Sequence, residues 1–145
     1  MMKNKNIAIG SDHAGFDLKE FIKGKFEQEI NWTDMGPSSA DRVDYPDYAH
    51  KVAESVSNNT VDLGILICGS GNGVCMTANK HEGVRAGLAW ESELASLARE
   101  HNNANVICLP ARFITEDQAV EIVRAYVDAE FEGGRHETRV QKIEK

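Results

Sequence analysis

The sequence is short of cysteine and has no long apolar run, and each shortage excludes a class of protein. Its 145 residues include 3 cysteines, Cys68, Cys75 and Cys108, and no two of them form a CxxC pair. An odd set without such a pair predicts neither a disulfide framework nor a zinc ribbon, so we expect reduced thiols. No stretch approaches the roughly 18 consecutive apolar residues of a membrane-spanning helix, and the start MMKNKNIAIG lacks the apolar region of a signal peptide. The expected compartment is therefore the cytoplasm.

Positive charge is also in short supply. Lys plus Arg number 16 against 23 for Asp plus Glu, which leaves a formal net charge of -7. This balance disfavours nucleic acid or an anionic membrane surface as the main partner. The content of 41% hydrophobic and 27% charged residues is typical of a globular domain, and the length leaves no room for two full domains. We therefore predict a single domain over residues 1–145, with a basic tail at 133–145.

What the sequence does contain is a regular alternation of short apolar runs and helical stripes. Strands are predicted over residues 7–10, 31–35, 63–68, 84–88 and 106–109. Helices are predicted over residues 16–26, 46–57, 74–80 and 91–100, with a last helix that starts at 115 and is ended by the glycine pair at 133–134. The last helix has the spacing of a capping box, Thr115 to Gln118, at its start.

Five strands alternating with five helices predict a parallel sheet, because right-handed crossovers place helices on both of its faces. The expected fold class is therefore α/β, with three layers. The run at 63–68 is apolar on every residue, which is typical of a central strand covered on both faces. In such sheets ligands bind outside the carboxyl ends of the strands. The loops of interest thus lie at 10–15, 69–73, 89–91 and 110–115.

The first of these loops places a carboxylate and an imidazole, Asp12 and His13, between Gly10 and Gly15. Its pattern is neither a phosphate-binding P-loop nor a dinucleotide fingerprint. If the fold is correct, both side chains face a ligand. Two simpler interpretations stay open: Asp12 caps the following helix, and His13 is a solvated loop residue.

The second loop, Gly69–Gly73, carries three glycines directly after a strand. Glycines let the backbone approach a ligand closely, and free amides at a helix N-terminus form an anion site. Such turns also allow close packing of helix on sheet, so this alternative stays open. Cys68 stands at the mouth of the loop, where a thiolate is favoured and can act as a nucleophile or a base. Otherwise it is a buried small hydrophobe, which is our interpretation of Cys75 and Cys108.

The remaining candidates are a histidine and three arginines. His101 precedes the fifth strand, at the wrong end of that strand for the pocket of its own subunit. It is therefore either structural or serves a neighbouring subunit, and plain loop chemistry is a further alternative for this polar segment. Arg112 follows the same strand and falls near the pocket. Arg135 and Arg139, four residues apart, would share one face of a helix and suit a phosphate, although a solvated basic face is also possible.

Five blocks taken together resemble a known family. They are GSDHAGFDLK at 10–19, DYPDYA at 44–49, CGSGNG at 68–73, AREHNNANVICLPAR at 98–112 and GGRHETRV at 133–140. In this order, and over nearly the whole chain, the blocks are similar to those of ribose-5-phosphate isomerase B. The resemblance implies a Rossmann-like α/β/α sandwich that interconverts ribose 5-phosphate and ribulose 5-phosphate in the pentose phosphate pathway. It also implies no metal and no cofactor, and a homodimer or dimer of dimers with sites between subunits.

The resemblance also implies roles for individual residues. Cys68 corresponds to the base that moves a proton between C2 and C1, whereas some members use a glutamate at the position of Val74 instead. His101 corresponds to the acid that opens the furanose ring. The implied substrate-binding residues are Asp12, His13, Gly69, Ser70, Gly71, Asn72, Gly73, Asn102, Arg112, Arg135 and Arg139.

The chemistry agrees with these roles, because an enediolate needs both a base and groups that stabilise its oxygens. Two other functions remain open. Relatives of the family isomerise hexose 6-phosphates such as allose 6-phosphate or galactose 6-phosphate, and some galactose 6-phosphate enzymes divide the site between two different subunits. This chain carries both Cys68 and His101, which favours a self-sufficient homo-oligomer. A non-catalytic sugar-phosphate-binding module is the third possibility, and loss of the base or the acid would have supported it.

Overall fold

A five-stranded parallel sheet forms the middle layer of the protein. The computed structural model describes residues 5–144, and all five strands lie within them: β1 (Lys5–Ser11), β2 (Ile30–Asp34), β3 (Leu63–Cys68), β4 (Ala86–Leu88) and β5 (Val106–Pro110). Their order is β2-β1-β3-β5-β4, and every neighbouring pair is parallel. The predicted α/β class with a parallel sheet is confirmed.

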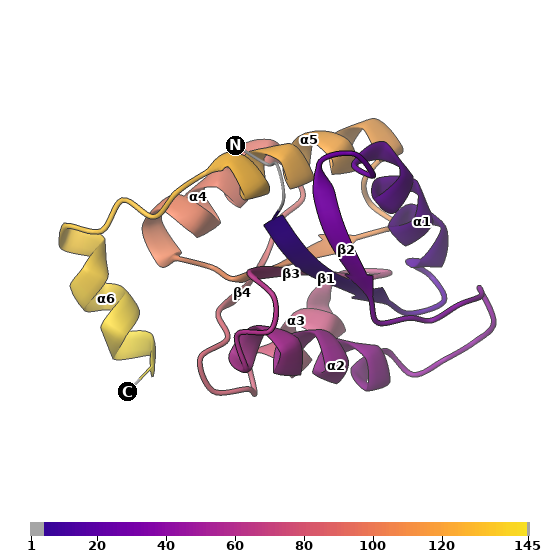
Figure 1. Ribbon diagram of the computed structural model, residues 1–145, viewed down its shortest axis with the longest axis horizontal. Coiled ribbons are helices and arrows are strands. Elements are labelled where there is room, and N and C mark those ends of the chain that lie inside the picture. The colour runs from indigo at the N-terminus through magenta and orange to yellow at the C-terminus, as the bar shows by residue number, and fades with distance from the viewer. Residues whose placement is uncertain (1–4, 145) are drawn as a thin grey trace.

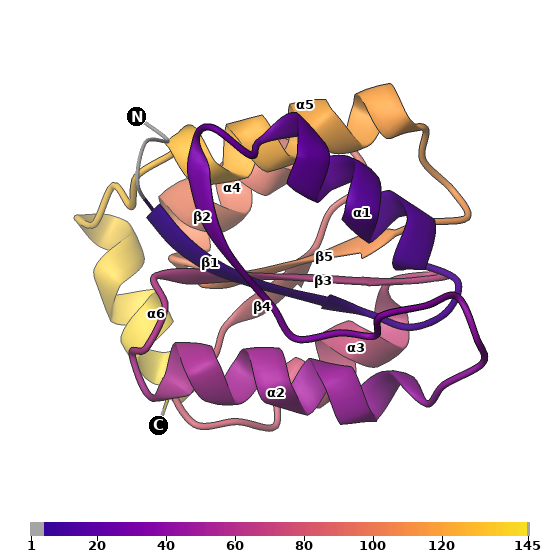
Figure 2. The same cartoon turned by 45° about the vertical axis from the view of Figure 1, so that its right-hand side comes forward.

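Helices cover both faces of the sheet, as Figures 1 and 2 show. Residues 5–144 form six of them: α1 (Phe16–Lys25), α2 (Tyr45–Ser57), α3 (Asn72–Ala78), α4 (Ser92–Asn102), α5 (Glu116–Asp128) and α6 (Arg135–Glu144). Helices α1, α4 and α5 lie on one face, and α2 and α3 lie on the other. The sixth, α6, lies beside the end of the sheet at which the strands begin.

The core consists of two apolar clusters, one under each helical layer. Strand β3 is buried along its whole length, as its continuous apolar run predicts. Gly64 in this strand brings α2 close, because a Cβ there would lie 2.8 Å from Val52. On the opposite face the Tyr126 hydroxyl donates to the Gly64 carbonyl over 3.2 Å. Each fully buried large aliphatic side chain contributes about 1.5–3 kcal/mol to this packing.

The prediction for the last helix is wrong in one respect. Helix α5 does start at the predicted capping box, but it ends at Asp128 rather than at Gly133–Gly134. Both glycines have positive φ, +68° and +55°, and they turn the chain into α6. The basic tail is therefore a helix, and it is anchored by the buried side chains of His136 and Val140. Within residues 5–144, none of the helices is long and apolar enough to cross a membrane.

Candidate functional site

Three loops meet at the end of the sheet where the strands finish, and backbone hydrogen bonds join them. The N–H of Asp12, after β1, donates to the Ile67 carbonyl over 3.1 Å. The N–H of Arg112, after β5, donates to the Gly69 carbonyl over 3.0 Å. The predicted loops at 10–15, 69–73 and 110–115 are thus neighbours, because β3 lies between β1 and β5 in the sheet.

Cys68 is the last residue of β3, and its sulfur accepts a hydrogen bond. The backbone N–H of Gly71 donates to the Cys68 Sγ over 3.2 Å. The residue is 5% exposed, so little water competes for this contact. A donated N–H stabilises negative charge on sulfur, and the thiolate is the form that removes protons. The geometry therefore suits a base.

The glycines of this loop also pack closely, so the alternative of close packing is correct in part. A Cβ on Gly71, whose φ is +79°, would collide with Leu88, and one on Gly73 would lie 2.5 Å from the ring of Tyr45. Ser70 and Asn72 are exposed between them. Sequence reasoning missed Tyr45, although it lies inside the quoted DYPDYA block. Its ring forms a wall of the loop at Gly73.

Asp12 is buried and holds the turn that follows β1. Its Oδ1 accepts the N–H of Gly15 over 2.9 Å. The alternative that Asp12 caps the next helix does not hold, because the N-cap of α1 is Gly15 and has no side-chain cap. The carboxylate instead organises the loop at the end of the strand.

His13 is half-buried and anchors a distant loop. The N–H of Val43 donates to His13 Nδ1 over 3.3 Å, so in the neutral ring the proton sits on Nε2. The alternative of a solvated loop histidine therefore does not hold. The remaining ring nitrogen is a hydrogen-bond donor, which suits an oxygen-rich ligand.

Arg112 places a positive charge directly beside the glycine loop. A Cβ on Gly69 would lie 3.0 Å from the Arg112 Nη1 atom, so the guanidinium occupies the space that a side chain at 69 would need. Arg112 itself is exposed. The absence of a side chain at Gly69 thus brings a cation close to the Cys68 loop.

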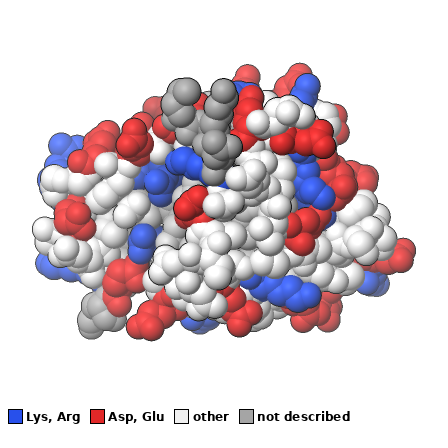
Figure 3. Space-filling view, viewed as in Figure 1, with Lys and Arg blue, Asp and Glu red and all other residues white. Residues whose placement is uncertain are grey.

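The other predicted residues lie at the opposite end of the sheet. His101 and Asn102 form the last turn of α4, and Arg135 and Arg139 are exposed on α6. Figure 2 shows α6 beside the end of the sheet at which the strands begin. The prediction that His101 lies at the wrong end for its own pocket is confirmed. One copy of the chain therefore does not bring His101, Asn102 or the two arginines to Cys68. On the face seen in Figure 3, acidic and basic side chains are interspersed, also at the end where α6 lies.

His101 stacks on His136, and both face one carboxylate. The ring centroids are 4.1 Å apart at an interplanar angle of 13°, and Glu132 Oε1 lies 3.7 Å and 3.6 Å from the two Nε2 atoms. Burial, the neighbouring His101 and the guanidinium of Arg135 lower the pKa of His136. Sequence reasoning assigned no role to Glu132 or His136, although His136 lies inside the quoted GGRHETRV block.

This cluster is a candidate metal site by composition, because its ligand atoms lie within 4.8 Å of one another among the described residues. Two features oppose a cation there. The rings of His101 and His136 are nearly parallel, so their lone pairs do not converge on one point. The guanidiniums of Arg135 and Arg139 on α6 also act electrostatically on His136. Both features make the cluster a poor metal site.

The prediction for the two remaining cysteines is correct only for Cys108. Cys108 is fully buried, and burial raises the pKa of its thiol. Cys75 packs against the apolar cluster under α2 and α3 but is only half-buried, and its thiol donates to the Ala86 carbonyl over 3.4 Å. A hydrogen bond with Cys108 lowers the pKa of Cys75. The predicted absence of disulfides agrees with three free thiols.

Comparison with known proteins places this geometry in a family. The Ribose/Galactose Isomerase family matches residues 7–143. The chain belongs to the ribose/galactose isomerase family. It is 48% identical over 145 residues to the probable ribose-5-phosphate isomerase B of Mycoplasma pneumoniae, covering 99% of this chain and 95% of that protein.

Solved structures of the family share the fold closely. Ribose 5-phosphate isomerase RpiB of Thermotoga maritima matches with a TM-score of 0.94 and 47% identity, over 97% of each chain. Ribose-5-phosphate isomerase B of Mycoplasma genitalium, solved with bound ribulose-5-phosphate, matches with a TM-score of 0.93 and 48% identity, over 99% of this chain and 96% of that chain. The three-layer fold of this chain is therefore the fold of the family.

Proposed function

We propose that this chain is an aldose-ketose isomerase that interconverts ribose 5-phosphate and ribulose 5-phosphate, without a metal or cofactor. The observation that carries the proposal is the hydrogen bond from the Gly71 amide to the Cys68 sulfur, 3.2 Å long, at the carboxyl end of β3. The relative from Mycoplasma pneumoniae is named for this reaction, and the structure from Mycoplasma genitalium holds ribulose-5-phosphate. Both support the choice of a five-carbon substrate.

The proposed chemistry begins at C2 of open-chain ribose 5-phosphate. The Cys68 thiolate removes the C2 proton, the electrons of that bond form a C1–C2 double bond, and the carbonyl oxygen O1 takes the negative charge. The thiol then returns its proton to C1, while O2 loses a proton to become the ketone oxygen and O1 gains one. Amides of the loop Gly69–Gly73 stabilise the enediolate oxygens. A base and these donors are what proton transfer next to a carbonyl requires.

Ring opening and phosphate binding require a second copy of the chain in this proposal. His101, with Asn102 beside it, would deliver a proton to the ring oxygen, because a positioned imidazole can act as a general acid. Because His101 lies at the far end of the sheet from Cys68, the α4–α6 end of one copy must face the glycine loop of its partner. A homodimer, or a dimer of such dimers, satisfies this requirement.

The phosphate is held by cations from both copies. Arg112 lies beside Gly69, and Arg135 and Arg139 come from α6 of the partner copy. Bidentate guanidinium contacts fix the position of a phosphate as well as its charge, which matters on a chain of net charge -7. Asp12 and the Nε2–H of His13 would contact the sugar hydroxyls.

The proposed setting follows from the chemistry of the base. An oxidised Cys68 could not accept a proton, so the enzyme requires a reducing compartment such as the cytoplasm. The reaction is a step of the pentose phosphate pathway. A hexose 6-phosphate such as allose 6-phosphate or galactose 6-phosphate is the second candidate substrate, and the galactose isomerases in the matching family favour it. A binding module without turnover is the third candidate, and the presence of both Cys68 and His101 argues against it.

The deciding experiment compares ribose 5-phosphate with allose 6-phosphate in metal-free buffer. Wild-type protein, Cys68→Ala and the control Cys75→Ala are assayed in parallel, and sugar-phosphate binding is measured by calorimetry. We expect fast conversion of the pentose by wild type and Cys75→Ala, and none by Cys68→Ala with binding retained. Faster conversion of the hexose would move the substrate to the six-carbon class. Binding without turnover in wild type would leave the binding module as the function.

A further inference from the structure

A fully buried lysine lies at the end of the GSDHAGFDLK block and has no part in the proposed chemistry. Lys19 projects from α1 with a side-chain exposure of 0%. Its Nζ pairs with Asp34 Oδ2 at 2.7 Å and with Glu20 Oε2 at 2.8 Å. It also lies 5.1 Å from the centroid of the Phe16 ring. A buried ammonium is costly unless it is paired, and here two carboxylates pair it.

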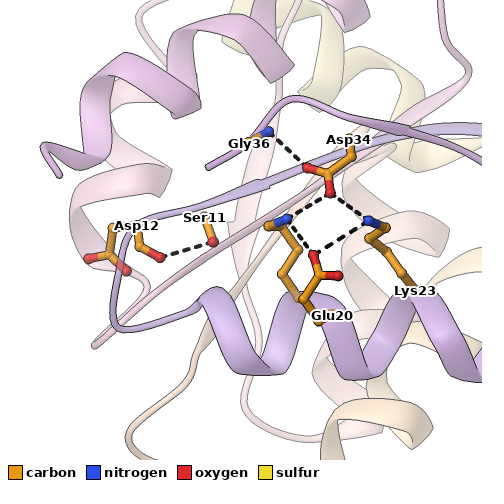
Figure 4. Close-up of polar contacts among 7 residues, drawn as sticks. Ser11, Asp12, Glu20, Lys23, Asp34 and Gly36 are labelled. Atoms are coloured by element: carbon orange, nitrogen blue, oxygen red, sulfur yellow. Dashed lines mark hydrogen bonds and ion pairs between the residues drawn. The ribbon is translucent and has the colours of Figure 1, made fainter. Parts of the chain in front are cut away.

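Lys23 completes the cluster from the solvent side. It contacts Asp34 Oδ2 at 2.6 Å and Glu20 Oε2 at 3.4 Å, as Figure 4 shows. Burial alone would raise the pKa of Asp34, but hydrogen bonds from Lys19, Lys23 and the Gly36 amide outweigh it and lower the pKa. Asp34 is therefore a carboxylate that holds several donors at once.

Stability alone does not account for this arrangement. Burying an ion pair costs desolvation, and apolar replacements of whole buried pairs are often neutral or stabilising. Removing one partner is damaging because it leaves the other charge uncompensated. The pair is therefore better explained by what it holds in place.

The pair is linked to the site through Gly36. The Gly36 N–H donates to Asp34 Oδ1 over 2.8 Å (Figure 4). The Gly36 carbonyl accepts the N–H of Ser11 over 3.1 Å. Ser11 is the last residue of β1, and its hydroxyl donates to the Asp12 carbonyl over 2.9 Å. Four consecutive contacts thus connect Lys19 to the backbone of Asp12.

The segment 35–44, which follows Asp34, also touches the site at its far end. Val43 donates to His13 Nδ1, and Tyr45, two residues further on, packs its ring against Gly73 of the Cys68 loop. The segment 35–44 is therefore held at Asp34 on one side and at His13 on the other. The segment anchored at Asp34 thus borders the site both at His13 and, through Tyr45, at the Cys68 loop.

We propose that Asp34 is a positioning residue: its Oδ1 holds the Gly36 N–H, and through Gly36 the backbone of Ser11 and Asp12, in the geometry that the sugar phosphate requires, while Lys19 compensates the charge of Asp34. Neither residue touches the substrate. The proposal rests on the proposed function for its kinetic consequence, whereas its structural consequence can be measured without a substrate.

The test uses two double variants that remove both charges and differ in one hydrogen-bond acceptor. Lys19→Met/Asp34→Asn keeps a side-chain oxygen for the Gly36 N–H, and Lys19→Met/Asp34→Ala does not. We expect the Asn variant to stay near the wild-type kcat and the Ala variant to lose about tenfold to a hundredfold, because small displacements at a site are expensive. Thermal unfolding shows whether both fold. Lys23→Met, which removes only the outer lysine, is the control and should change kcat less than about threefold.

Amide hydrogen exchange at Ser11 provides the readout that needs no substrate. We expect wild-type protection in the Asn variant and faster exchange in the Ala variant, with core strand β3 unchanged. Equal kcat, KM and Ser11 exchange in two folded double variants would overturn the proposal. If wild-type protein does not turn over ribose 5-phosphate, the proposed function fails, and the exchange result still decides the positioning role.

Discussion

The backbone N–H of Gly71 donates a hydrogen bond to the sulfur of Cys68 over 3.2 Å. Gly71 reaches this position with φ at +79°, and a Cβ there would collide with Leu88. The amide that stabilises charge on the sulfur therefore belongs to a position that only glycine can occupy without strain. Loop conformation and thiol environment cannot be changed independently.

Replacing this glycine tests that coupling. We expect Gly71→Ala to lose about 1–2 kcal/mol of stability from the left-handed backbone, and more from the contact with Leu88. It should also lose most of its isomerase activity. Gly83→Ala is the matched control, because Gly83 has the same φ of +79° and has open space around it. Thermal unfolding and kcat are measured on both, and a fully active Gly71→Ala protein would show that the loop geometry is not needed.

Mixing two inactive variants tests whether each site uses two copies. Cys68→Ala and His101→Asn should each be inactive on ring-closed ribose 5-phosphate. Unfolding and refolding them together should restore about a quarter of wild-type activity, since half of randomly formed dimers are hybrids and one of the two sites in each is intact. If mixtures stay inactive while hybrids form, both residues act within one copy. His101→Asn should also retain more activity on an open-chain substrate.

The two arginines of α6 should affect substrate binding more than chemistry. We expect Arg135→Ala and Arg139→Ala to raise KM about tenfold to a hundredfold, because each removes a charge-assisted hydrogen bond to phosphate. Lys142→Ala is the control, since Lys142 is also an exposed cation on α6. Steady-state kinetics give kcat and KM separately. A similar rise in KM for Lys142→Ala would indicate a general effect of charge rather than specific contacts.

The packing of α6 should depend on pH through His136. The pKa of His136 is lowered in the folded protein, chiefly by burial and further by His101 and the arginines on α6. As pH falls below about 6.5, the unfolded chain binds a proton at His136 more readily than the folded chain does. The folded protein therefore becomes less stable as pH falls through this range. We expect the urea midpoint to drop between pH 7.5 and 5.5, and to drop less in His136→Gln. Parallel pH profiles for the two proteins would contradict this.

Several elements could be predicted because their signals are local. The continuous apolar run Leu63–Cys68 matches β3 at both ends, and the capping box at Thr115 starts α5 as expected. The glycine pair 133–134 misled the prediction, because a glycine at positive φ ends one helix as readily as it turns the chain into the next. The sequence carries both possibilities, and packing of His136 selects one.

In the site, too, the residues with local sequence signals were predicted and the contacts made by tertiary packing were not. Asp12, Cys68 and the glycine loop were expected at the carboxyl ends of the strands, and they lie there because parallel strands all finish at one edge of the sheet. The ring of Tyr45 on Gly73 and the stack of His101 on His136 were not expected. These contacts join segments that are distant in sequence or depend on how α6 docks, and no local period encodes them.

The sequence by itself determined the class of fold, the order of its elements up to α5 and the residue types at the ends of the strands, because hydrophobic period and turn chemistry act over a few residues. The tertiary structure alone decided which of these residues meet. It placed the Gly71 amide on the Cys68 sulfur, buried Lys19 against Asp34, and left His101 at the far end of the sheet. Such contacts depend on strand order and on side-chain packing across the whole domain. The free energy of that packing is a sum over residues that are distant in the sequence, so no short stretch of sequence determines it.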